Sequence, residues 1–203
     1  MTEKTTPERI YDAAKTEFLE KGFKSASLRN IVTAAGVTTG AFYGYYSSKE
    51  NVFCAIVDEQ YTALMNTYRA ALEKFEKLPP NEQTEHMSEI SQGCLHQMLL
   101  YAYVHPDEFT LLLTCAEGTR YERFIDEIVE LKIEYTHKYQ EVLRKHGIPS
   151  PHIDPQLEHI ITTGMFNAYF ELIIHKMPLD RAEKYLDEMS AFYQAGWLKI
   201  MGQ

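Results

Sequence analysis

Apolar residues recur along this chain mainly three and four positions apart, which is the spacing of an α-helix that buries one face. Leu28, Ile31, Val32 and Ala35 give the clearest case, because they fall at i, i+3, i+4 and i+7. No segment alternates apolar and polar residues as a half-buried strand does, and no Asn-Gly hairpin signal occurs. The pattern therefore predicts an all-α protein.

Proline, glycine and small polar residues indicate where the first helices begin and end. We expect the first helix to start at Thr6-Pro7 and to end at Gly22. Ser27 is the expected N-cap of a second helix, which Gly36 ends. Two short helices joined by a glycine turn to a third are typical of a helix-turn-helix.

The third helix is very short, and Val37, Phe42 and Tyr46 form its expected buried side. Its other side is small and rich in hydroxyl groups. The residues expected to face outward are Thr39, Gly40, Tyr43 and Gly44, flanked by Thr38 and Tyr45.

A fourth helix is expected from Ser48 to beyond Phe75, and long helices follow it. Their expected spans are about Thr84 to His105, Asp107 to Cys115, Glu117 to Gly147, Asp154 to His175 and Leu179 to Met201. About nine helices result, and we divide them into a domain of residues 1–50 and a domain of residues 51–203.

Charge is distributed unevenly between these two parts. The chain of 203 residues has a net charge of −9, yet residues 1–50 carry about +1. Any polyanion is therefore expected to meet the first domain. The three cysteines form no CxxC pair, and no apolar run is long enough to span a bilayer. We expect a cytoplasmic protein that makes no use of a membrane.

The outward set on the third helix suits contact with DNA. Tyrosine and threonine hydroxyls donate to phosphate oxygens, and a threonine methyl group can contact a thymine methyl group. Gly40 lets the backbone approach a surface closely. Lys49 lies in the first turn of the next helix, where free N–H groups also attract anions. These features indicate a helix end that docks in a major groove.

The segment from about Pro7 to Val57 resembles the DNA-binding domain of the TetR family of transcriptional regulators. The resemblance rests on the Gly-Phe pair after the first helix, the Ala-Gly-Val turn, the aromatic run FYGYY and the SKEN entry to the fourth helix. It implies a helical domain for ligand binding and dimerisation in the rest of the chain.

The resemblance also implies which side chains touch DNA. The matching positions are Ser27, Thr38, Thr39, Gly40, Tyr43, Tyr45 and Lys49, with Arg29 at a position that sometimes reads a base. One departure is Gly44, which stands where many members carry a contacting side chain.

The last two helices are candidates for the contact between two subunits. The first is unusually apolar, with Gly164 and Ala168 at i and i+4, where small residues let another helix pack closely. The second carries Leu186, Phe192 and Trp197 among its apolar residues. We expect a homodimer through a four-helix bundle, although these residues would also serve an internal core. A two-fold dimer reads a palindromic operator with two recognition helices.

The central helices must supply any effector pocket. Aromatic residues and methionines with few charges suit a moderately apolar small molecule, although the same pattern is common in plain cores. The candidate lining residues are Leu95, Met98, Leu99, Tyr103, Phe109, Leu113, Tyr135, Met165, Phe166 and Tyr169.

No catalytic or cofactor motif is found, and Glu171 with His175 lacks a third residue at metal-ligand spacing. We expect no enzyme, no cofactor and no metal site. The sequence predicts a regulator, expected to be a repressor, that an effector releases from DNA. Regulation by a partner protein or by no signal, and an enzyme built on the same helical body, remain as alternatives.

Overall fold

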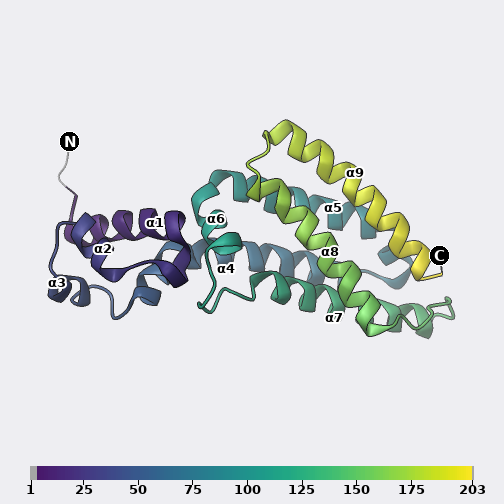
Figure 1. Cartoon of the computed structure of the whole chain (residues 1–203). Helices are drawn as coiled ribbons and strands as arrows, with labels where there is room; N and C mark the ends of the chain where they lie inside the picture. The colour runs from purple at the N-terminus through teal and green to yellow at the C-terminus, as the bar shows by residue number, and fades with distance from the viewer. Residues whose placement is uncertain (1–3, 203) are drawn as a thin grey trace. The chain divides into compact units, whose positions relative to one another are not determined.

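The computed structural model describes residues 4–202, and within this range the chain forms nine α-helices and no strand (Figure 1). The all-α prediction is confirmed. The helices are α1 Thr6–Ser25, α2 Leu28–Ala34, α3 Thr39–Tyr43, α4 Lys49–Glu76, α5 Pro80–Val104, α6 Pro106–Thr114, α7 Phe124–Lys145, α8 Pro155–Ile174 and α9 Leu179–Ile200.

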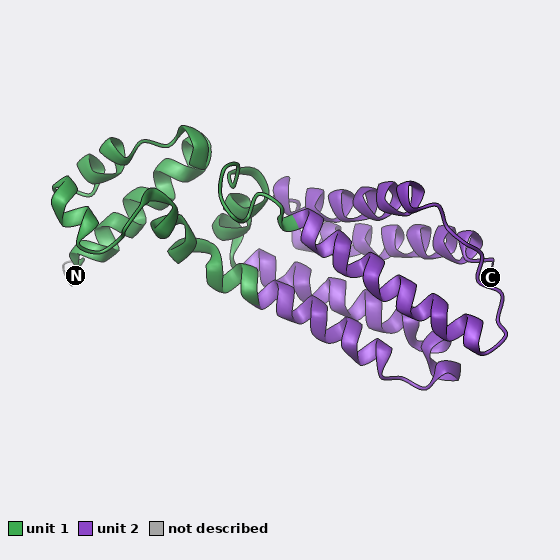
Figure 2. Cartoon of the chain, turned by 90° about the horizontal axis from the view of Figure 1, so that it is seen from below, with its two compact units in different colours: residues 1–62, 105–124 green, residues 63–104, 125–203 purple. Residues whose placement is uncertain are grey.

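The helices group into two compact units (Figure 2). The first unit extends to Thr62 and adds the later segment His105–Phe124, and the second unit holds Ala63–Val104 together with the chain from Ile125 onward. Helix α4 therefore contributes its first half to one unit and its second half to the other.

The first unit is built on the amphipathic stripes of its short helices. Ile10, Phe18, Ile31 and Phe42 are fully buried, so α1, α2 and α3 share one core. Helix α6 packs against α1, where the Lys15 ammonium lies 2.8 Å from the Glu108 carboxylate. The sequence placed the segment of α6 in the second domain because nothing local indicates this distant pairing.

The beginning of α1 differs by one residue from the expected start. Thr5, not Thr6, is the N-cap, and its backbone N–H donates to the Glu8 carboxylate at 2.7 Å. Gly22 has a φ of 70°, so helical geometry breaks where the sequence indicated, although a short helical turn follows as far as Ser25.

Two later helices begin at other positions than expected. Helix α5 starts at Pro80 rather than near Thr84. Proline suits the first helical position, because an N–H there would have no acceptor within the helix and proline lacks that N–H. Helix α7 starts at Phe124 rather than near Glu117, because Gly118 adopts a φ of 83° and the chain turns there. The second unit has a hydrophobic core cluster made of Tyr139, Leu143, Ile153, Trp197 and Met201.

Candidate nucleic-acid interface and internal cavity

The turn between α2 and α3 sets the orientation of the short third helix. Gly36 has a φ of 63°, which a residue with a side chain rarely adopts, and the Val37 N–H donates to the Val32 carbonyl at 3.0 Å. Thr38 then caps α3, because its hydroxyl oxygen accepts a hydrogen bond from the Ala41 N–H at 3.1 Å. The turn thus determines which face of α3 is buried.

The opposite face of α3 is open to solvent. Phe42 is fully buried, whereas Tyr43 and Tyr45 are each 54% exposed, and Thr39 is also exposed. A Cβ atom added at Gly40 would meet nothing closer than 3.9 Å, so the fold itself does not require glycine there. The result is a small surface of hydroxyl groups and bare backbone.

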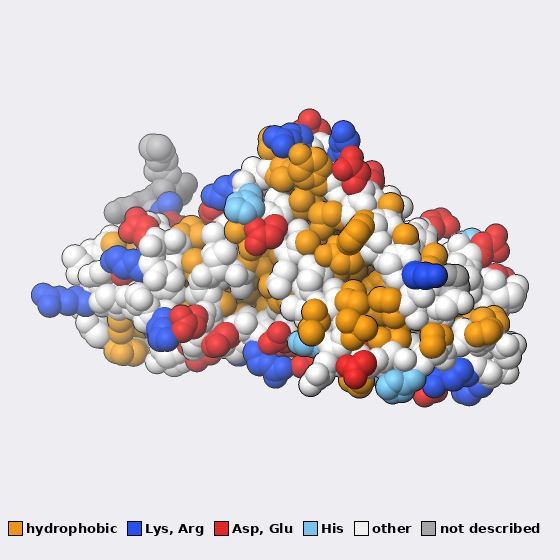
Figure 3. All heavy atoms as spheres, turned by 45° about the vertical axis from the view of Figure 1, so that its right-hand side comes forward, with side chains coloured by type: hydrophobic (Ala, Val, Ile, Leu, Met, Phe, Trp, Pro, Cys, Tyr) orange, Lys and Arg blue, Asp and Glu red, His pale blue; other side chains and the backbone are white. Residues whose placement is uncertain are grey.

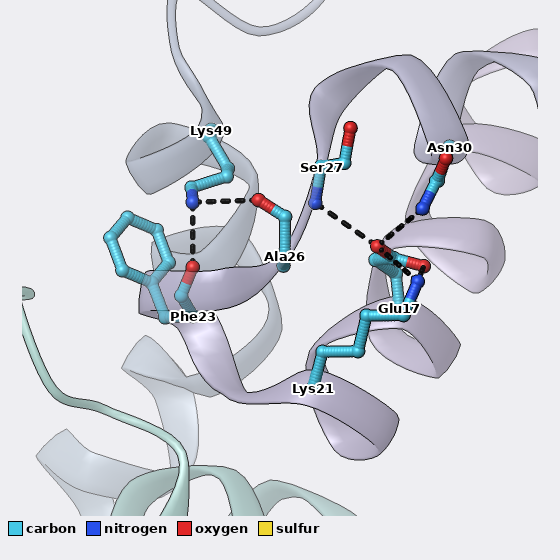
Figure 4. Close-up of polar contacts among 7 residues, drawn as sticks. All are labelled: Glu17, Lys21, Phe23, Ala26, Ser27, Asn30 and Lys49. Atoms are coloured by element: carbon cyan, nitrogen blue, oxygen red, sulfur yellow. Dashed lines mark hydrogen bonds and ion pairs between the residues drawn. The ribbon is translucent and has the colours of Figure 1, made fainter.

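A buried carboxylate fixes the beginning of α2 (Figure 4). Glu17 is only 7% exposed, and its carboxylate accepts hydrogen bonds from the Ser27 N–H at 3.0 Å, the Asn30 amide at 3.0 Å and the Lys21 ammonium at 2.9 Å. Desolvation disfavours the charged form, but these donors outweigh it and lower the pKa of Glu17. The Ser27 hydroxyl makes no capping bond and stays available to an outside acceptor.

Lys49 lies at the start of α4, with its ammonium turned toward the end of α1 (Figure 4). It donates to the Phe23 carbonyl at 2.6 Å and to the Ala26 carbonyl at 2.9 Å, and it lies 4.4 Å from the centre of the Phe23 ring. Desolvation lowers the pKa of Lys49. Two of its three N–H groups are therefore used within the protein, which leaves one for an outside acceptor.

Arg29 is the remaining expected contact residue, and Gly44 is the departure from the family pattern. Arg29 is exposed on α2, and Gly44 follows α3 as its C-cap. The first unit thus holds all eight expected residues on α2, on α3, in the turns beside them and at the start of α4. None of the eight is acidic, so the set presents donors and one exposed cation.

The second unit contains a cavity with a volume of about 140 Å³. Side chains from α4, α5, α7, α8 and α9 line it, and most are aromatic or aliphatic. One buried water needs only about 10–15 Å³ by this measure, so the space suits a small organic molecule.

The structure separates the predicted pocket residues into two groups. Leu95, Tyr135, Met165, Phe166 and Tyr169 line this cavity. The other five do not.

The five residues outside the cavity have other surroundings. Met98 and Leu99 are buried elsewhere on α5. The Tyr103 hydroxyl donates to the Met177 carbonyl at 2.6 Å. Phe109 and Leu113 belong to α6, in the first unit.

Sequence reasoning missed Lys132 and Trp197, which both line the cavity. Lys132 falls in phase with Ile128, Val129 and Tyr139, which are buried on the same helix. A lysine at an apolar position of an amphipathic helix was the signal that could have found it.

Helices α8 and α9 leave an apolar face uncovered, and hydrophobic side chains gather in a band over this part of the molecule (Figure 3). Ile160 is 66% exposed and Phe192 is 73% exposed. A Cβ atom added at Gly164 or Gly196 would meet no atom of the described residues within 4 Å, so these two glycines leave room for another helix. Exposed apolar surface of this kind is typical of an interface.

Glu171 and His175 form an exposed pair at 2.7 Å, and no group of three potential metal ligands occurs among residues 4–202. Within the same residues, no helix has both the length and the apolar character needed to cross a membrane.

Comparison with known proteins matches the helix-turn-helix part of the first unit to a family model. Residues 10–56 match the model of the bacterial regulatory proteins of the tetR family. The uncharacterised regulator YfiR of Bacillus subtilis is 25% identical over 72% of this chain and 67% of its own length. The repressor DhaR of Mycobacterium sp. is 30% identical, over only 38% of this chain and 42% of its own length.

Solved structures match almost the whole chain. A TetR-family regulator from Bordetella parapertussis is 16% identical with a TM-score of 0.59, over 97% of this chain and 98% of that one. A TetR-like regulator from Rhodococcus sp. RHA1 has a TM-score of 0.56, with 16% identity and full coverage of both chains. These likenesses establish the fold. The family match of residues 10–56 adds that the helix-turn-helix part of this chain resembles that of the tetR-family regulatory proteins.

Proposed function

We propose that the protein is a cytoplasmic repressor that binds a palindromic operator as a homodimer and leaves it when a small molecule binds. The observation that carries this proposal is the exposed face of α3, where hydroxyl groups and bare backbone surround a buried Phe42. DhaR and the Rhodococcus jostii protein KstR2 are named as transcriptional repressors, which supports the same direction of control.

In this proposal each contact residue has a physical role on the DNA. Thr39 and Gly40 approach the base edges, because they stand at the open end of α3. Tyr43 donates to phosphate oxygens. Ser27, Arg29, Thr38 and Tyr45 extend the contact on either side, and the third N–H of Lys49 reaches a backbone phosphate.

Dimerisation uses the uncovered face of α8 and α9. Phe192 is the proposed anchor, since a large aromatic side chain that is 73% exposed in the subunit gains most from being covered. The bare backbone at Gly164 lets a partner helix pack closely. Two recognition helices related by a two-fold axis then read both halves of an inverted repeat.

The proposed signal travels along α4. Tyr68 and Phe75 of this helix line the cavity, while its first residue, Lys49, holds the end of α1. A ligand that prefers one arrangement of α4 therefore shifts the population toward subunits that fit DNA less well. The size of this effect equals the difference in ligand affinity between the two arrangements.

A second candidate is the same DNA reader with a protein partner as its signal. The exposed apolar face favours it only if that face remains free in the dimer. The relatives named above are regulators rather than enzymes, and catalysis is not part of either proposal.

The test is a gel-shift titration of the purified protein with DNA fragments that carry inverted repeats, at near-physiological salt. The proposal predicts one dimer for each repeat and loss of binding in Thr39→Ala combined with Tyr43→Phe. Binding that is equal on all sequences, or unchanged in the double variant, contradicts it.

A further inference from the structure

Most side chains that line the cavity of the second unit are apolar, serine, threonine and glutamine add neutral polar groups, and one side chain is cationic. Among the described residues that line it, Lys132 alone carries a full charge, and no aspartate, glutamate, arginine or histidine joins it. Burial in such surroundings disfavours an ion unless a partner of opposite charge is present.

Lys132 has no such partner among the residues that the structure describes. No carboxylate or carbonyl among residues 4–202 accepts a hydrogen bond or forms an ion pair with its ammonium, whereas Lys138, two turns further along α7, pairs with Glu134 at 3.0 Å. Desolvation lowers the pKa of Lys132, which is the direction expected for a cation that lacks a counter-charge.

The neighbouring titratable groups do not supply a negative charge. Burial raises the pKa of the Cys94 thiol to about 11. It also raises the pKa values of Tyr68 and Tyr169 well above their usual range. All three groups are therefore neutral near pH 7, and the Tyr169 hydroxyl is already bonded to the Leu95 carbonyl at 3.0 Å.

Lys132 is partly buried, and two other polar atoms of the lining, the Ser190 hydroxyl and the Trp197 indole N–H, are fully buried without a hydrogen bond. The indole N–H can only donate a hydrogen bond, and the same holds for the Lys132 ammonium. A ligand that carries hydrogen-bond acceptors would therefore pair with the groups of the cavity that lack a partner.

We infer that the effector is a monocarboxylic acid with an apolar body, whose carboxylate pairs with the Lys132 ammonium inside the cavity. One unpaired cation matches one negative charge, and the aromatic and aliphatic walls match a hydrocarbon body. A volume of about 140 Å³ favours a short aliphatic or single-ring acid. This inference deepens the proposed function, since it names the class of molecule that would act on DNA binding.

Trp197 is the only tryptophan in the chain and lines the cavity, so its fluorescence reports occupancy directly. The experiment titrates the full-length protein with two matched pairs of probes, octanoate against octan-1-ol and 3-phenylpropionate against 3-phenylpropan-1-ol. Each pair shares an apolar body and differs in charge.

The wild-type protein should bind each acid at least about tenfold more tightly than its alcohol, as one charge-assisted hydrogen bond provides. Lys132→Met should remove this preference while the alcohol binds as before. The variant should melt at the wild-type temperature or above it, because it loses only an unpaired charge. Lys145→Met, an exposed position on the same helix, should behave as wild type.

Alcohols that bind as tightly as acids, or an acid preference that persists in Lys132→Met, overturn the inference. Because the wild-type comparison needs no variant, a misfolded Lys132→Met leaves the test intact, and Lys132→Gln then takes its place. A Lys132-dependent acid that binds but leaves the gel shift unchanged supports the inference and contradicts effector release. Absence of acid binding with normal operator binding overturns the inference and leaves DNA recognition standing.

Discussion

Replacing Lys49 with alanine tests how the DNA-reading unit is held together and how it contacts DNA. The ammonium group joins the start of α4 to the carbonyls of Phe23 and Ala26 at the end of α1. We expect Lys49→Ala to lower both the stability of the protein and the salt dependence of its DNA binding, for two separable reasons.

The loss of stability follows from the contacts within the subunit. A hydrogen bond to a charged group contributes about 1.5–3 kcal/mol, and Lys49 makes two at 2.6 Å and 2.9 Å. Desolvation of the ammonium offsets part of this gain, as the lowered pKa of Lys49 indicates. A net loss of about 3 kcal/mol follows, which corresponds to a fall of roughly 6–12 °C in melting temperature for a chain of this size.

The change in salt dependence follows from the third N–H group. Each phosphate contact adds about 0.9 to the slope of log affinity against log salt, so two lysines in a dimer contribute roughly 2. Thermal melting, monitored by circular dichroism, measures the loss of stability. Operator titrations at salt concentrations from about 50 to about 200 mM measure the slope of log affinity against log salt. Lys145→Ala is the matched control, because this lysine is exposed on α7.

Each half of the reasoning has its own refutation. An unchanged melting temperature would show that the two hydrogen bonds to the carbonyls contribute no net stability beyond what hydrogen bonds to water provide. An unchanged slope with reduced stability would show that Lys49 is purely a positioning residue. In that case we expect the salt dependence to come from Arg29, which is exposed on α2.

Four further outcomes are expected. Glu17→Gln should destabilise the first unit near neutral pH and make its stability less sensitive to acid. The pKa of Glu17 is lowered in the fold, so its ionised carboxylate stabilises the fold above about pH 4.3, and this stabilisation is lost as the pH falls through the folded pKa. Acid melting curves that are equal for both proteins would refute this. Phe192→Ala should weaken the dimer about a thousandfold, at about 2 kcal/mol for each of two copies, and an unchanged sedimentation profile would exclude that anchor. Thr39→Ala should change the preferred bases at one position of each half-site, which sequencing of selected DNA reveals, and an unaltered preference would mean that α3 docks in another register. Tyr43→Phe should weaken binding to all sequences alike, and a loss confined to the operator would contradict a phosphate contact.

Most of the helices could be predicted from local patterns in the sequence. The stripe of Ile31, Val32 and Ala35 is buried, as its spacing predicts, and the glycine turn at Gly36 occurs where it was expected. Local signals suffice here because short amphipathic helices with caps determine their own ends. The predicted start of α5 was wrong, because a pair of prolines is equally typical of a loop and of the first turn of a helix.

The contacts that depend on distant parts of the chain were beyond sequence reasoning. The carbonyl partners of Lys49 lie 26 and 23 residues away, and nothing near Lys49 in the sequence points to them. Leu95 and Leu99 lie about one turn apart on the same face of α5, so the sequence did not distinguish Leu95, which lines the cavity, from Leu99, which is buried elsewhere. Only the arrangement of five helices in space makes that distinction.

The central claim is that this chain reads an inverted repeat in DNA as a dimer. The most direct test is selection of fragments of the source genome by the purified full-length protein at near-physiological salt, followed by sequencing. The account predicts enrichment of one inverted repeat, with half-sites about one helical turn apart or a multiple of it, and loss of that enrichment in the Thr39→Ala and Tyr43→Phe double variant. Failure of a folded, dimeric protein to enrich any sequence would contradict it.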